Sequence, residues 1–277
     1  MKFNDLKRCL RFRPFDVTTQ EGRSEERHRQ ILLTTISSGG SKILAVAISF
    51  LMIPLTLDYL GTERFGLWMA ISSTVAMLSF ADLGIGSGLM NAIATAYGKN
   101  DIQAIRKKIS VGLFLLGVIA SVIILIFFIF EGLIPWGKLF NINSELAAEV
   151  AVPTITVVVV WFAISMPAGV AIKVLMGLQR GFAANIWLAT ASIASLICVI
   201  GVVHFEGGLP SLATATIAPP IVAGIIAALY LFLKKGTFLM PQFGNISFDD
   251  VKDLAGTSGL FFLLQYAQLL LFSQTIL

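Results

Sequence analysis

The chain has 277 residues, of which 56% are hydrophobic and 13% are charged, and its mean hydropathy is +0.86. A soluble domain carries about 25% charged residues, so most of this surface must face lipid. The net charge of +4 comes from Lys and Arg in short segments between long apolar runs, which argues against nucleic-acid binding and indicates membrane topology.

Residues 1–29 contain eight Lys and Arg residues and five acidic residues, without the apolar core of a cleavable signal peptide. We expect this segment to be a retained, basic cytoplasmic tail. The chain has only two cysteines, Cys9 in this tail and Cys198 in a later apolar run. Their different surroundings argue against a disulfide between them.

Apolar runs long enough to cross a bilayer as helices occupy most of the remaining chain. The first two are interrupted by one charge each, 31–57 by Lys42 and 65–97 by Asp82. Five more contain no charge: 109–130, 150–172, 182–203, 209–233 and 254–277. The sequence therefore predicts an all-α fold, a polytopic membrane helix bundle of about seven transmembrane helices.

Basic residues fall on alternate connections of this bundle. Positively charged connections stay in the cytoplasm during insertion, so we expect a multi-pass membrane protein with a cytoplasmic N-terminus. Beyond the tail, one side would carry Lys99, Arg106, Lys107, Lys108, Lys173, Arg180, Lys234, Lys235 and Lys252, and the other only Arg64 and Lys138.

These runs suggest a division of the chain into four parts. After the tail, a six-helix N-terminal lobe would cover 30–233 and a cytoplasmic linker 234–253. Residues 254–277 would form the first helix of an incomplete second lobe, because no loop or further span follows them. We therefore expect a truncated protein, although a natural protein with an odd number of spans would have the same pattern.

Two ionisable residues lie deep inside predicted spans. Lys42 lies roughly 18 Å and Asp82 roughly 22 Å from the cytoplasmic ends of their runs, at 1.5 Å per residue. A charge near the midplane costs several kcal/mol, so such residues usually face a cavity and have partners. We expect Lys42 and Asp82 to pair. The pair either lines a hydrated substrate cavity, with Lys42 attracting a phosphate, or only holds two helices together.

Helix-breaking residues also occur within the spans. Gly84, Gly86 and Gly88 follow Asp82 at alternate positions and favour close helix packing, or else a local hinge beside the cavity. Pro219 and Pro220 remove two backbone donors near the middle of the sixth run, where we expect a bend. Pro167 has the same effect in the fourth run. Such breaks flank substrate paths in transporters, but they also occur as passive structure.

No group of residues indicates catalysis. The only two histidines are His28 in the tail and His204 near an outer connection, without metal-ligand spacing, and neither cysteine lies beside a histidine. The sequence also lacks a phosphate-binding P-loop. We therefore expect neither an enzyme nor a metal or other cofactor.

Three segments resemble a known family. They are residues 53–68, IPLTLDYLGTERFGLW, residues 80–89, FADLGIGSGL, and residues 96–101, AYGKND, which lead into Arg106-Lys107-Lys108. Together they are similar to the polysaccharide biosynthesis protein family, the Wzx-type O-antigen flippases of the multidrug, oligosaccharidyl-lipid and polysaccharide exporter superfamily. The resemblance extends from about Arg29 to the end of the chain, with most of its specificity in the first two spans.

The resemblance implies two six-helix lobes related by a pseudo-twofold axis, of which this chain would supply one lobe and the next helix. It also implies a role in flipping undecaprenyl-pyrophosphate-linked oligosaccharide across the bacterial inner membrane for O-antigen or capsule synthesis. The partners would be this lipid-linked oligosaccharide, membrane lipid and other polysaccharide-assembly membrane proteins.

Three alternatives remain open. A drug or cation exporter of the same superfamily would favour acidic cavity residues, against which Lys42 argues mildly. A partial transporter that is inactive or serves only in assembly would fit a truncated lobe. A membrane glycosyltransferase or polymerase would need a large polar loop, and the longest outer connection is short.

Overall fold

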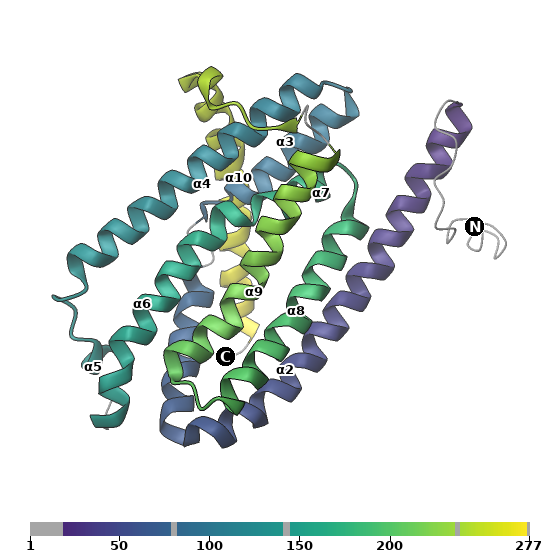
Figure 1. Cartoon of the computed structure of the whole chain (residues 1–277). Coiled ribbons are helices and arrows are strands. Elements are labelled where there is room, and N and C mark those ends of the chain that lie inside the picture. Colours follow the sequence, from purple (N-terminus) through teal and green to yellow (C-terminus); the bar gives the residue numbers. More distant parts are fainter. Residues whose placement is uncertain (1–18, 79–81, 141–144, 236–238, 276–277) are drawn as a thin grey trace.

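The computed structural model describes residues 19–78, 82–140, 145–235 and 239–275, and within them every regular element is a helix. The long helices run side by side as a tilted bundle (Figure 1). In the described residues, five helical segments are long and apolar enough to cross a membrane: Ser24–Thr74, Ile102–Phe130, Glu149–Gly177, Gly181–His204 and Leu209–Leu233. The prediction of a polytopic, all-α membrane bundle is confirmed.

The first predicted span and the start of the second share one element, α2, which covers Gln20–Leu78. Its 59 residues would extend about 88 Å as a straight helix, almost three times the hydrocarbon thickness of a bilayer. The chain instead turns at Gly61, whose φ of 71° and ψ of 168° are not helical. The Tyr59 hydroxyl donates to the Gly207 carbonyl over 2.6 Å and ties this turn to another connection.

The second predicted span, 65–97, is not a single helix. After α2 ends at Leu78, helix α3 covers only Ile85–Gly98, and Leu83 and Gly84 adopt left-handed φ values of 52° and 72°. The prediction of one continuous run is therefore wrong, because apolarity alone does not detect a break in a helix. The five segments count the first predicted span and the start of the second as one, Ser24–Thr74, and in the described residues they do not include α10.

The remaining elements follow the predicted runs more closely. In chain order they are α4 Ile102–Phe130, α5 Trp136–Leu139, α6 Glu145–Ala168, α7 Val170–Gly177, α8 Gly181–His204, α9 Leu209–Leu229, the π-helix η2 Tyr230–Lys235, the 3-10 helix η4 Phe243–Asn245 and α10 Phe248–Thr275. Helix α10 includes part of the predicted linker as well as the last predicted run.

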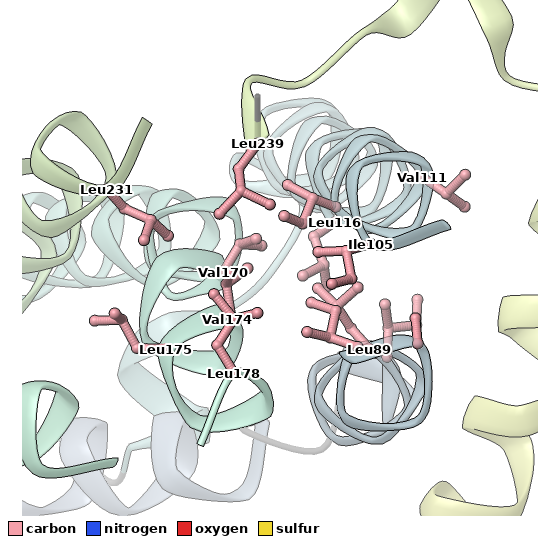
Figure 2. Packing of buried hydrophobic residues seen from close by; sticks show 14 of the residues in the cluster. Leu89, Ile105, Val111, Leu116, Val170, Val174, Leu175, Leu178, Leu231 and Leu239 are labelled. Atoms are coloured by element: carbon pink, nitrogen blue, oxygen red, sulfur yellow. The ribbon is translucent and has the colours of Figure 1, made fainter. Parts of the chain in front are cut away.

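Buried apolar residues form two clusters, one toward each end of the bundle. The first joins α3, α4 and α7 through fully buried side chains such as Leu89, Val111 and Val174 (Figure 2). The second joins the turn of α2 to α6, α8 and α9, and includes Val158 and Leu212. Many outer residues are exposed and apolar, which is the expected surface of a bundle immersed in lipid.

Helix α10 packs against α3 at glycines. A Cβ atom on Gly88 would lie 3.0 Å from the Cα atom of Ser258, and one on Gly84 would lie 2.6 Å from the Ser258 carbonyl oxygen. Membrane helices associate through such close contacts, because lipid provides no hydrophobic drive between them. Gly84 and Gly88 therefore permit the close approach of α10, in line with the packing interpretation, and the left-handed φ of Gly84 also places it at the break before α3.

A valine at Gly88 should separate α3 from α10. We expect Gly88→Val to destabilise the purified chain in detergent by about 1–3 kcal/mol, the usual cost of overpacking. Thermal or denaturant unfolding measures this change. Gly117→Val is the matched control, because no atom lies within 4 Å of a Cβ placed there. Equal stability of the two variants would contradict the packing role of Gly88.

Candidate functional site

Asp82 lies in the break before α3 and binds the exposed backbone of that helix. Its Oδ1 accepts a hydrogen bond from Gly84 N over 2.9 Å, and its Oδ2 accepts one from Gly86 N over 3.4 Å. The first N–H groups of a helix have no intrahelical partner, and its N-terminus favours negative charge. The half-buried carboxylate therefore stabilises the start of α3 in a region where lipid could not.

A lysine from α7 lies beside this carboxylate. A Cβ on Gly86 would be 3.0 Å from Asp82 Oδ2, 3.2 Å from Lys173 Cε and 3.8 Å from Lys173 Nζ. Since these distances start from one point, the ammonium and the carboxylate lie no more than about 7 Å apart, although they do not form a direct ion pair. Gly86 thus leaves the space in which the two charged groups approach each other.

The predicted pair of Lys42 and Asp82 is not formed in the structure. Lys42 is exposed on α2 and makes no ion pair with any residue in the described ranges. The prediction assumed that consecutive spans are neighbours, but α2 packs mainly against α8, whereas α3 packs against α4, α7 and α10. Asp82 therefore faces a different helix from the one expected.

The sequence pattern places Lys173 in a basic connection, because this residue directly follows an apolar run. The helical structure in fact continues through α7 as far as Gly177, and Val174 and Leu175 are buried. The three apolar residues after Lys173, Val174 to Met176, were the available signal that the span does not end at the charge.

Of the predicted proline sites, one lies at a helix break and the other lies inside a continuous helix. After Pro167, α6 ends at Ala168, and α7 begins at Val170. Pro219 and Pro220 lie inside the continuous helix α9. Because Pro220 has no N–H, the Thr216 carbonyl loses its normal donor, and the Ser195 hydroxyl of α8 donates to it over 3.2 Å instead.

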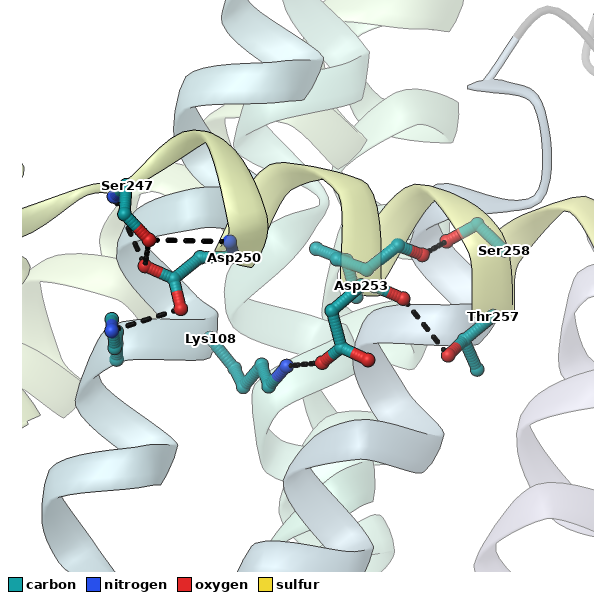
Figure 3. Close-up of polar contacts among 8 residues, drawn as sticks. Lys108, Ser247, Asp250, Asp253, Thr257 and Ser258 are labelled. Carbon is teal, nitrogen blue, oxygen red and sulfur yellow. Dashed lines mark hydrogen bonds and ion pairs between the residues drawn. The ribbon is translucent and has the colours of Figure 1, made fainter.

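A second polar cluster joins the start of α4 to α10 and to the residues before it (Figure 3). We call it the basic clamp. Lys107 Nζ lies 2.8 Å from Asp250 Oδ1, and Lys108 pairs with Asp253. Arg106 Nε donates to the Met240 carbonyl over 2.6 Å. The clamp brings basic segment 106–108 and segment 240–253 to one end of the bundle, as the predicted alternation of connections requires.

Within the clamp, Asp250 is held in its charged form. Hydrogen bonds from Lys107 and from Ser247 lower the pKa of its carboxyl group from 3.8 to about 2. The same carboxylate accepts from the Ser247 backbone N–H over 3.0 Å, so it also organises the first turn of α10.

The clamp should therefore weaken in acid. A group whose pKa is lowered by folding stabilises the fold above its unfolded pKa of 3.8, and this contribution disappears as the pH falls toward 2. We expect Asp250→Asn to lower the thermal midpoint in detergent at neutral pH, with the difference from wild type shrinking across that interval.

Asp249→Asn is the control for this titration. Asp249 is an exposed neighbour that forms no ion pair within the described part of the chain. A midpoint difference for Asp250→Asn that stays constant from neutral pH to pH 2 would contradict the assigned role.

Two curated proteins match part of this chain. Among curated proteins, a putative O-antigen transporter of Salmonella typhimurium is 25% identical over 176 residues, which are 64% of this chain and 40% of that protein. A putative O-antigen export protein of Yersinia pseudotuberculosis is 35% identical over 63 residues, 23% of this chain and 14% of that protein. The chain thus matches less than half the length of these relatives.

Solved structures share the fold. A transporter of the MOP superfamily from Pyrococcus furiosus matches with a TM-score of 0.68 and 18% identity, over 87% of this chain and 53% of that one. A MATE protein in its straight conformation matches with a TM-score of 0.69 and 20% identity, over 87% of this chain and 53% of that one. The family model for polysaccharide biosynthesis proteins matches residues 31–276. The chain therefore belongs to the polysaccharide biosynthesis protein family.

Proposed function

We propose that this chain takes part in moving lipid-linked oligosaccharide, carried on undecaprenyl pyrophosphate, across the bacterial inner membrane for O-antigen or capsule synthesis. The observation that carries the proposal is the family match over residues 31–276. The names of the two curated relatives, an O-antigen transporter and an O-antigen export protein, support it. The proposal assigns transport rather than catalysis to the chain.

The membrane arrangement supports this role. We propose that the N-terminus is cytoplasmic, since the basic clamp gathers Arg106, Lys107 and Lys108 with the start of α10 at one end of the bundle. Because the chain spans about half the length of the solved structures that it matches, a complete substrate path would include a second lobe. Other polysaccharide-assembly membrane proteins are proposed partners.

Lys173 and Asp82 are the proposed site of substrate contact. Lys173 is half-buried, within about 7 Å of the Asp82 carboxylate and without a direct ion pair, so its ammonium can attract a phosphate of the carrier lipid. The charge of Asp82 would hold that ammonium in position, in the space that Gly86 leaves by having no side chain. Lys42, exposed on α2, is proposed as a second cation on the route.

The structural neighbours include MATE transporters, so export of a drug or cation is the second candidate. Their identity of 20% or less supports a common fold rather than a common substrate. The family match favours a polysaccharide substrate.

Loss and restoration of surface polysaccharide test the function. Deleting the gene in its own host should abolish surface O-antigen or capsule and leave lipid-linked oligosaccharide on the cytoplasmic leaflet. Returning the full gene should restore the polymer, measured by gel electrophoresis of surface polysaccharide. Unchanged polysaccharide after deletion would refute the proposal, and changed drug resistance instead would support the second candidate.

Variants at the charged pair test the proposed contact. Lys173→Gln should slow export about tenfold or more, the effect of losing about 1.4 kcal/mol, whereas Lys173→Arg should keep most activity. Lys138→Gln is a control on the predicted outer side. Asp82→Asn keeps a side-chain acceptor for α3 but removes the charge.

The double variant Asp82→Asn/Lys173→Gln distinguishes the two interpretations of the pair. If Lys173 binds phosphate, the double variant should be as slow as Lys173→Gln. Recovery of export in the double variant would show that Lys173 only neutralises Asp82, and it would contradict the phosphate contact.

A further inference from the structure

A long apolar groove lies between α8 and α9, away from the charged pair. Its volume is about 490 Å³. It extends on α8 from Trp187 to Cys198 and on α9 from Thr214 to Ile226, which corresponds to roughly 16–18 Å along each helix. Small side chains make the hollow, and they include Ala191 and Ala194 on α8 and Ala215, Ala218 and Ala223 on α9.

The wall of this groove offers almost no free polar group. The hydroxyls of its two threonines point to their own helices: Thr190 Oγ1 donates to the Trp187 carbonyl over 2.9 Å, and Thr214 Oγ1 donates to the Pro210 carbonyl over 3.0 Å. The Thr216 carbonyl, released by Pro220, accepts from Ser195 over 3.2 Å. Apart from the Trp187 indole and the Cys198 thiol, a ligand in this groove would therefore meet apolar groups.

The position of the groove determines what can fill it. Both helices belong to membrane-length apolar segments, Gly181–His204 and Leu209–Leu233. The groove therefore opens toward hydrocarbon, and its natural occupant is a hydrocarbon chain that lies along the two helices. Methyl groups of five alanines form part of its wall.

We propose that the α8–α9 groove binds the polyprenyl chain of the lipid-linked substrate. This inference rests on the proposed function, because the carrier's chain must stay in the membrane beside the protein while its polar head crosses. The groove holds the chain on one face of the bundle, while Lys173 and Asp82 act on the head group from α7 and the start of α3.

Trp187 provides a reporter inside the groove. In the full chain carrying Trp68→Phe, Trp136→Phe and Trp161→Phe, Trp187 is the only tryptophan. In nanodiscs of phosphatidylcholine with brominated acyl chains, its emission should be quenched by the chain that occupies the groove. Added undecaprenyl phosphate without bromine should displace that chain and restore the emission in a saturable manner.

Larger side chains in the groove should prevent the recovery of Trp187 emission. Ala194→Leu and Ala218→Leu should each cause loss of the recovery, whereas Ala189→Leu and Ala228→Leu, the same change at positions outside the lining, should keep it. A thermal unfolding midpoint shows that each variant is folded. If Ala194→Leu and Ala218→Leu are folded and their Trp187 emission recovers as fully as in the two control variants, the proposal is overturned.

Unbrominated phosphatidylcholine at the same mole fraction tests selectivity. Equal recovery with this lipid would identify a general acyl-chain groove and overturn polyprenyl binding, as would the absence of any recovery. Because binding is measured without transport, its failure is distinct from failure of the proposed function, which the deletion strain reports.

Discussion

The rest of this structure depends on one constraint: a backbone group that loses its helical hydrogen-bond partner inside the membrane must find another within the protein. Lipid cannot replace a missing hydrogen bond, so each interruption needs a donor or acceptor from a side chain. Asp82 supplies the acceptor at the start of α3, and Ser195 supplies the donor opposite Pro220. Each position lies near a place to which we assign substrate contact: the start of α3 lies beside Lys173, and the prolines of α9 lie at the α8–α9 groove.

The alternating glycines before and within α3 have different roles. Gly84 and Gly88 face α10 and permit its backbone to approach, whereas Gly86 faces Asp82 and Lys173. Close packing of α10 and the placement of a charged pair are therefore built from one short segment. The basic clamp holds the start of α10 against α4, so α10 is fixed to α3 by packing and to α4 by charge.

The two proposed contacts bind chemically different parts of the substrate, its phosphate and its polyprenyl chain. A phosphate needs a cation that is not already paired, and Lys173 lies near Asp82 without a direct ion pair. A polyprenyl chain needs a largely apolar surface, and the α8–α9 groove provides one, since the hydroxyls of its two threonines are bonded to their own helices. The head group and the chain would thus be recognised by different helices of the same bundle.

The sequence by itself determined the membrane location, the helical class and the family, because hydropathy, basic connections and the motifs of residues 53–68 and 80–89 are local properties of the chain. The sequence also identified Asp82 and the helix breakers as unusual residues within apolar runs. Only the tertiary structure decided that Asp82 lies beside Lys173 rather than Lys42, because the neighbours of a helix depend on packing and not on chain order. The α8–α9 groove could not be predicted from the sequence for the same reason, since the alanines that line it come from two helices.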